Sequence, residues 1–189
     1  MKKIAILLVL IIFYASNTWA QKIDPQVKKE VELMSILARL AGYGEYNDDR
    51  GGRYTADIDS ILRKYRSHEA VEMMKLFSEK YGLGYDRVMS IALQIECRGD
   101  NIVKLDTGKK SISPIGQKET HEFLSALNDF YRTSRFNDFF NTHTDIYELG
   151  LQVFNDSVMA HFDQEWYTRF YGTPPAEQFR IIIGFTNGP

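Results

Sequence analysis

His121 and Glu122 come closer to a catalytic motif than other pairs in this chain. They begin like the HExxH motif of zinc peptidases, in which a second histidine one helical turn later lets both imidazoles reach one metal ion. The fifth position here is Ser125, so the sequence predicts an exposed histidine at a helix start and no zinc site. His143 and His161 have no partner at ligand spacing, and we expect them to make hydrogen bonds at helix ends or between helices.

Cys97 and the segment Arg50–Arg53 are two further candidates for chemistry. Cys97 is the only cysteine of the chain. A catalytic thiolate needs a nearby base or a positive field, and the neighbouring Glu96 opposes thiolate formation, so a buried structural thiol is predicted. The Arg-Gly-Gly-Arg segment has the composition of an anion-binding loop but lacks a preceding strand and a Walker pattern, so a solvated turn is predicted.

A polar stripe interrupts the most apolar helical segment of the mature chain. Glu32, Ser35 and Arg39 stand at offsets of three and seven, so they share one face of the helix predicted over residues 26–41. Charges on such a helix are costly to bury unless they are paired. Two interpretations remain open: an internal ion pair that fixes helix packing, or the polar wall of a cleft.

The elements that must position these residues are mostly helices. The segment from His121 to Tyr171 contains 13 of the chain's 25 aromatic residues, and they recur at offsets of three, four and seven. This spacing places each set on one helix face. Because large aromatic side chains bury about 150–250 Å² each, these helices are expected to carry much of the core.

Hydrophobic spacing and turn residues predict the remaining helices. The first is apolar on nearly every side, which is typical of a buried helix, and it ends at Gly42. Ser67 and Thr144 are the expected N-caps of later helices. The predicted helices before the aromatic segment cover residues 26–41, 56–65, 68–81 and 86–97.

Strand signals are few. Residues 98–117 form the least regular segment, which we expect to be either functional or a mobile excursion, with a short strand over Ile102–Leu105. The β-branched run Phe179–Phe185 is the strongest strand signal of the mature chain. Its only candidate neighbour is the weak strand Ile102–Leu105, so we expect the closing strand to be the least stable element, either poorly packed or paired between molecules. The predicted fold is therefore mainly α, a multi-helix domain with one C-terminal strand.

The first twenty residues have the pattern of a secretory signal peptide. Lys2 and Lys3 precede the apolar run Ile4–Tyr14, and Ala20 supplies a small residue at the cleavage point. The mature chain then begins near Gln21, has a net charge of −4, and has no basic cluster that favours nucleic acid. We expect an exported, periplasmic or secreted protein without a membrane span in its mature part.

Three parts follow from these patterns. Residues 1–20 are the signal peptide, residues 21–175 the helical domain, and residues 176–189 the start of a β-containing part. Because a lone strand needs a partner strand, we expect this last part to be truncated.

Several stretches, in order and spacing, carry a family resemblance. Residues 31–36, 39–42 and 45–47 are similar to the opening of a family of secreted bacterial proteins, domain of unknown function 4932, which is common in the Bacteroides group. Later segments of the chain are similar to later parts of the family, so the resemblance covers residues 23–189. These segments are Tyr85-Asp86 with Met89, Phe136–His143, Trp166–Gly172 and the closing strand with Asn187-Gly188.

The resemblance implies a function for the longer members of the family. They resemble HExxH zinc metallopeptidases whose zinc-binding helix follows the strand and Asn-Gly turn, and with it the fold becomes α+β. No zinc ligand or catalytic glutamate falls within this chain, so no cofactor is expected in it and zinc is implied for the longer members only. Candidate cleft or substrate-side residues are Glu32, Arg39, Glu45, Tyr46, Asn47, Asn187 and Gly188.

Two functions remain open. The chain is either the N-terminal half of an exported metallopeptidase-like protein that handles peptide or protein substrates and is inactive by itself, or a non-catalytic secreted helical binding module. In the first case, Phe179–Thr186 corresponds to the edge strand that pairs with extended substrate.

Overall fold

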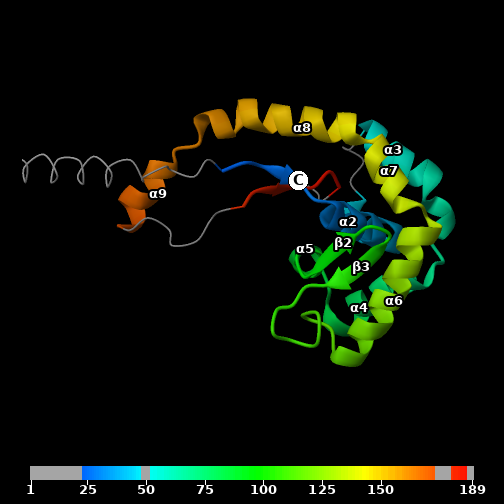
Figure 1. Cartoon of the computed structure of the whole chain (residues 1–189). Coiled ribbons are helices and arrows are strands. Elements are labelled where there is room, and N and C mark those ends of the chain that lie inside the picture. Colours follow the sequence, from blue (N-terminus) through cyan, green and yellow to red (C-terminus); the bar gives the residue numbers. More distant parts are fainter. Residues whose placement is uncertain (1–22, 48–51, 173–179, 187–189) are drawn as a thin grey trace, which may run out of the picture. The chain divides into compact units, whose positions relative to one another are not determined.

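The computed structural model describes residues 23–47, 52–172 and 180–186 (Figure 1). The predicted signal peptide and the candidates Asn187 and Gly188 lie outside these residues. The chain divides into two compact units. One contains the short helix α9 (Gln164–Tyr171), and the other contains the remaining helices and strands.

The larger unit is helical, which confirms the predicted mainly α class. In the described part of the chain, no helix combines the length and the apolar character that crossing a bilayer requires. The α-helices of the larger unit are α2 (Lys29–Ala41), α3 (Gly52–Ile61), α4 (Glu69–Tyr81), α5 (Tyr85–Ala92), α6 (Gln117–Thr133), α7 (Phe136–Thr142) and α8 (Thr144–Ser157). Short 3₁₀ turns are η1 (Gly44–Tyr46), η3 (Arg63–Tyr65) and η4 (Met159–His161).

Helix α2 lies at the centre of this unit. Every residue from Val31 to Leu40 is buried, as its apolar circumference predicted. The helix ends at Gly42, whose φ of 87° is the left-handed conformation that glycine adopts without strain. It begins at Lys29 and not at Gln26, because Gln26 and Val27 form the short strand β1.

The aromatic segment contributes to the core along only part of its length. The rings of Phe123, Phe130 and Phe136 are fully buried in α6 and α7. In α8 the one buried residue is Tyr147, and in α9 the side chain of Phe170 is 65% exposed. The aromatic segment therefore carries much of the core, as expected, but only as far as Tyr147. Helix α8 extends away from the other helices of its unit (Figure 1).

Two pairs of strands accompany the helices. The antiparallel hairpin joins β2 (Ile95–Arg98) to β3 (Asn101–Lys104), which confirms the strand expected near Ile102. The fourth helix consequently ends at Ala92 and not at Cys97. The closing strand β4 (Ile182–Ile183) pairs in parallel with β1 of the same chain and not with the Ile102–Leu105 segment, so the expectation that it lacks a partner within the molecule is wrong. Its partner β1 lies near the other end of the chain, at residues that were predicted to begin the first helix.

Helix starts account for the other corrections. Helix α3 begins at Gly52, so Arg53 belongs to its first turn and not to a solvated loop. His68, and not Ser67, caps α4, because its Nδ1 accepts a hydrogen bond from the Ala70 N–H at 3.2 Å. His143 precedes α8, which places Thr144 inside the helix.

The closing segment, residues 182–186, packs against the helices of the larger unit. The Phe185 ring lies 5.8 Å from the ring of Tyr54 and 5.2 Å from that of Tyr147, measured between centroids. It also lies against Gly150 of α8, where a Cβ atom would come within 2.4 Å of the ring. This close approach favours glycine at position 150, and the Phe185 ring packs between α3 and α8.

A double-mutant cycle tests this packing. Phe185→Ala is expected to cost about 2 kcal/mol of unfolding free energy, because it removes a half-buried ring from two aromatic neighbours. Gly150→Ala should destabilise the wild type through the clash. In the Phe185→Ala background it should instead stabilise by up to about 1 kcal/mol, the difference in helix propensity. Denaturant unfolding of the four proteins measures this; Gly150→Ala stabilising the wild type would contradict the packing.

Candidate functional site

A buried carboxyl group lies where α2, α3, α8 and the closing segment meet. The Tyr54 hydroxyl donates to Glu32 Oε2 at 2.7 Å, and the Phe185 N–H donates to Glu32 Oε1 at 2.9 Å. Glu32 is fully buried. Burial raises its pKa from 4.5 to about 7, although the hydrogen bonds from Tyr54 and from the Phe185 amide oppose the shift.

The two tyrosines extend this carboxyl group into a chain of hydrogen bonds. The Tyr54 and Tyr147 hydroxyls are 2.9 Å apart. Burial raises the pKa of both phenols, so both keep their protons near neutral pH. With Glu32 ionised, Tyr147 donates to Tyr54 and Tyr54 donates to the carboxylate. With Glu32 protonated, both bonds can reverse, so that the carboxyl group donates to Tyr54 and Tyr54 donates to Tyr147; the Tyr147 hydroxyl hydrogen then has no acceptor among these three groups.

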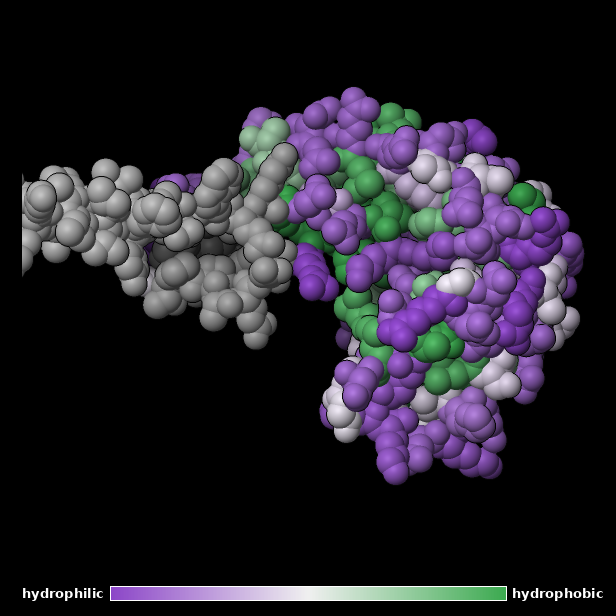
Figure 2. Space-filling view, viewed as in Figure 1, coloured by the Kyte–Doolittle hydropathy of each residue, from purple (hydrophilic) through white to green (hydrophobic). Residues whose placement is uncertain are grey.

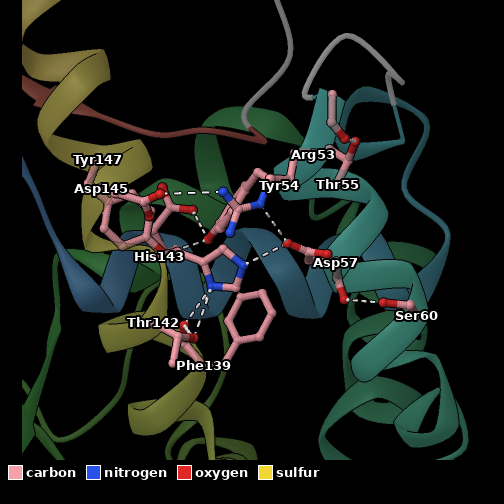
Figure 3. A network of polar contacts seen from close by, with 12 residues as sticks. Arg53, Tyr54, Thr55, Asp57, Ser60, Phe139, Thr142, His143, Asp145 and Tyr147 are labelled. Atoms are coloured by element: carbon pink, nitrogen blue, oxygen red, sulfur yellow. Dashed lines mark hydrogen bonds and ion pairs between the residues drawn. The ribbon is translucent and has the colours of Figure 1, made fainter.

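A second polar group, around His143, lies beside Tyr54 (Figure 3). His143 Nδ1 is 2.7 Å from the Phe139 carbonyl oxygen, and Nε2 is 3.2 Å from Asp57 Oδ2. The imidazole ring thus bridges a main-chain carbonyl of α7 and a carboxyl group of α3. The expected role for His143, hydrogen bonding between helices, is confirmed, because the ring joins α7 to α3.

Arg53 continues this group toward the surface. Its Nε is 3.5 Å from Asp57 Oδ2, and its Nη1 is 3.4 Å from Asp145 Oδ2 (Figure 3). Both contacts are exposed on the arginine side, and such pairs contribute little to stability. Their effect is to place one cation between a carboxylate of α3 and a carboxylate of α8.

The polar stripe of α2 is divided between different partners. Arg39 binds Asp59 of α3 through Nε at 3.2 Å and Nη2 at 2.7 Å, and donates from Nη1 to the Tyr46 carbonyl at 3.0 Å. The hydrogen bond from Arg39 lowers the pKa of Asp59. The Ser35 hydroxyl donates to the Val31 carbonyl at 2.7 Å. The interpretation as an internal ion pair is thus confirmed for Arg39, whereas Glu32 belongs to the tyrosine chain.

The next three candidates have separate positions. The buried Tyr46 donates from its hydroxyl to the Tyr85 carbonyl at 2.9 Å. Asn47 Nδ2 donates to the carbonyls of Tyr43 at 2.7 Å and Arg39 at 3.1 Å, which closes the turn after α2. Glu45 is exposed and lines a depression of about 600 Å³ at the ends of α2 and α4. The structure therefore does not bring these candidates together with Glu32 into one cleft.

Metal-binding and thiol chemistry find little support in the described residues. Among them, no group of three or more histidine, cysteine, aspartate or glutamate side chains is placed to share a metal ion. His121 and His161 are exposed. Burial raises the pKa of the Cys97 thiol to about 12, and the Glu30 carboxylate adds to the shift. The half-buried thiol therefore stays protonated, as expected for a structural cysteine.

Sequence reasoning missed Tyr54 and the Phe185 amide as partners of Glu32. Tyr54 was expected to lie outside a helix, and a backbone amide leaves no trace in residue type. A charged residue on a helix that is apolar all round was the available signal, because it requires a polar partner from elsewhere in the chain.

A change of Glu32 to glutamine tests the buried carboxyl group. Since its pKa is raised, the folded state binds more protons than the unfolded state between pH 4.5 and about 7. Its contribution to stability is therefore fully present below pH 4.5 and is lost as the pH rises through 7, by on the order of 3 kcal/mol. Glu32→Gln should lose this part of the pH dependence, measured as the difference between the two unfolding free energies.

The exposed Glu122 offers a matched control. Glu122→Gln makes the same chemical change without burial, so its stability should follow that of the wild type between pH 4.5 and 8. Equal slopes for the wild type and Glu32→Gln would show that Glu32 titrates as an ordinary exposed carboxyl.

The comparisons with known proteins identify a family and no characterised relative. The family described as Domain of unknown function (DUF4932) matches residues 23–186, which is most of the chain. No curated protein and no solved structure matches the chain significantly. The match extends from the residues before β1 to the closing segment and includes every element of the site. The chain therefore belongs to the Domain of unknown function (DUF4932) family.

Proposed function

We propose that this chain is the N-terminal helical portion of an exported, metallopeptidase-like protein, and that its closing segment presents extended peptide substrates. The observation that carries this proposal is the anchoring of residues 182–186 in the helical body. Three contacts hold this short segment. It pairs in parallel with β1, the Phe185 N–H donates to Glu32, and the Phe185 ring contacts Gly150.

An anchored strand with an open edge suits peptide binding. Among the described residues, β4 has β1 as its strand neighbour on one edge. An extended peptide can add to the other edge through main-chain hydrogen bonds, which provide affinity without demanding particular side chains. Because the strand is already held, binding would not have to order it first.

The proposal assigns binding, and not hydrolysis, to this region. Its polar groups are engaged with one another: Glu32 with Tyr54 and the Phe185 amide, and Arg39 with Asp59. The zinc ligands and the general base implied by the family resemblance belong to the longer members. The role of the buried carboxyl group is then to position the substrate strand.

A specific observation also favours the alternative, a non-catalytic binding module. Leu149 and Val153, one turn apart on α8, are 61% and 55% exposed. The face of the molecule in Figure 2 is largely hydrophilic, with hydrophobic residues gathered in patches. An apolar helix face of this kind can be covered by a partner.

Amide hydrogen exchange distinguishes the two functions. An extended apolar peptide should slow exchange of amides in residues 182–184, since new main-chain hydrogen bonds form there. The same peptide N-methylated at alternate positions is the matched control, because it keeps the side chains and loses donors. Protection confined to α8, or equal protection by both peptides, would contradict the substrate-strand function.

Export has its own test. We expect signal peptidase to cleave after Ala20, because two lysines and an apolar run precede this small residue. N-terminal sequencing of protein purified from the native organism should begin at or near Gln21. A cytosolic product that still begins at Met1 would contradict export.

A further inference from the structure

The segment between β3 and α6 is irregular but firmly attached. The Ser113 N–H donates to Gln94 Oε1 at 3.0 Å, and Gln94 Nε2 donates back to the Ser113 carbonyl at 3.1 Å. The Ile112 N–H donates to the Thr120 hydroxyl at 2.8 Å, and Ile112 is fully buried. Of the two alternatives expected for this segment, these contacts favour a functional element over a mobile excursion.

The attachment gathers three lysines and a histidine that are distant in the sequence. Lys104 ends β3, Lys110 lies in the attached segment, and Lys118 and His121 belong to the first turns of α6. Together they line a depression of about 630 Å³, and no carboxylate is among the described residues that line it. The chain as a whole carries a net charge of −2, so this concentration of positive charge is local.

The depression has an apolar part as well. Leu124 lines it beside Gln117 and Thr120, and the lysine stems add aliphatic surface. Lys104 Nζ donates to the Leu105 carbonyl at 2.8 Å, and an ammonium group has two further donors. Lys118 Nζ lies 3.8 Å from Glu122, a loose exposed pair that a ligand anion can replace at small cost.

We propose that this depression binds a small organic anion that carries a phosphate or carboxylate group next to an apolar moiety. The three lysines and His121 would contact the anionic group, and Leu124 would contact the apolar moiety. The volume lies within the range of small-molecule sites, about 300–1,000 Å³. This site is separate from Glu32 and from the closing segment, so it does not depend on the function proposed above.

The test compares two pairs of lysine substitutions with the same change in net charge. The site variant is Lys110→Gln with Lys118→Gln, and the matched control is Lys64→Gln with Lys75→Gln, on the exposed Lys64 of η3 and the partly exposed Lys75 of α4. Phenyl phosphate is the probe, and calorimetry gives its dissociation constant. The site variant should bind about tenfold more weakly, or 1.4 kcal/mol, while the control stays within about twofold of the wild type.

Three further measurements define the ligand. Inorganic phosphate should bind more weakly than phenyl phosphate, because it lacks the apolar moiety. Leu124→Ser should weaken phenyl phosphate and leave inorganic phosphate unchanged. Benzoate in place of phenyl phosphate shows whether a carboxylate or a phosphate ester is preferred, and saturable binding of either at the site supports the proposal.

Two outcomes would overturn the proposal. One is the absence of saturable binding of phenyl phosphate and benzoate in the millimolar range. The other is equal affinity of the site variant and the matched control, which would show that binding follows net charge and not this depression. Both variants change side chains that solvent reaches, and thermal unfolding verifies that each remains folded.

Discussion

The burial of a charged stripe on α2 is the constraint on which the rest of the structure depends. Glu32 and Arg39 lie on a helix whose other faces are all covered. A buried charge without a partner would cost several kcal/mol, so each of them has to be matched by a group from another element. Asp59 and Tyr54 of α3 and the Phe185 amide of the closing segment are those groups. The polar groups of α2 thus select the positions of its neighbours, which apolar contacts alone would leave less specific.

The same constraint joins the two ends of the described chain. Strand β1 leads directly into α2, and β4 pairs with β1 while its neighbouring residue Phe185 binds Glu32. Backbone pairing with β1 and the hydrogen bond to the Glu32 side chain therefore hold one and the same segment. A two-stranded ribbon is marginal by itself in water, and here the helices supply the missing stability through the Phe185 ring and Gly150. The protonation state of Glu32 in turn bears on how strongly the segment is held.

The buried and exposed parts of the aromatic segment differ for a simple reason. Helices α6 and α7 face α4 and α2, so their rings are covered, whereas no residue of α8 after Tyr147 is buried. Amphipathic spacing is equally regular in all of them. Periodicity shows which residues share a face, but it carries no information about whether another element covers that face.

The sequence by itself determined the helical class, the buried central helix with its end at Gly42, the strand near Ile102, and the need for partners around Glu32 and Arg39. These follow from local periodicity, from the conformational freedom of glycine and from the cost of an unpaired charge, all of which are properties of residue types. Only the tertiary structure decided who those partners are. The partner groups come from distant parts of the chain: Asp59, Tyr54 and the Phe185 amide. Neither short segment shows by its own sequence that Gln26–Val27 pairs in parallel with Ile182–Ile183. The tertiary structure likewise brings together Lys104, Lys110 and Lys118. The sequence shows the three charges, but their proximity depends on the hydrogen bonds that Gln94 and Thr120 make with the segment between β3 and α6.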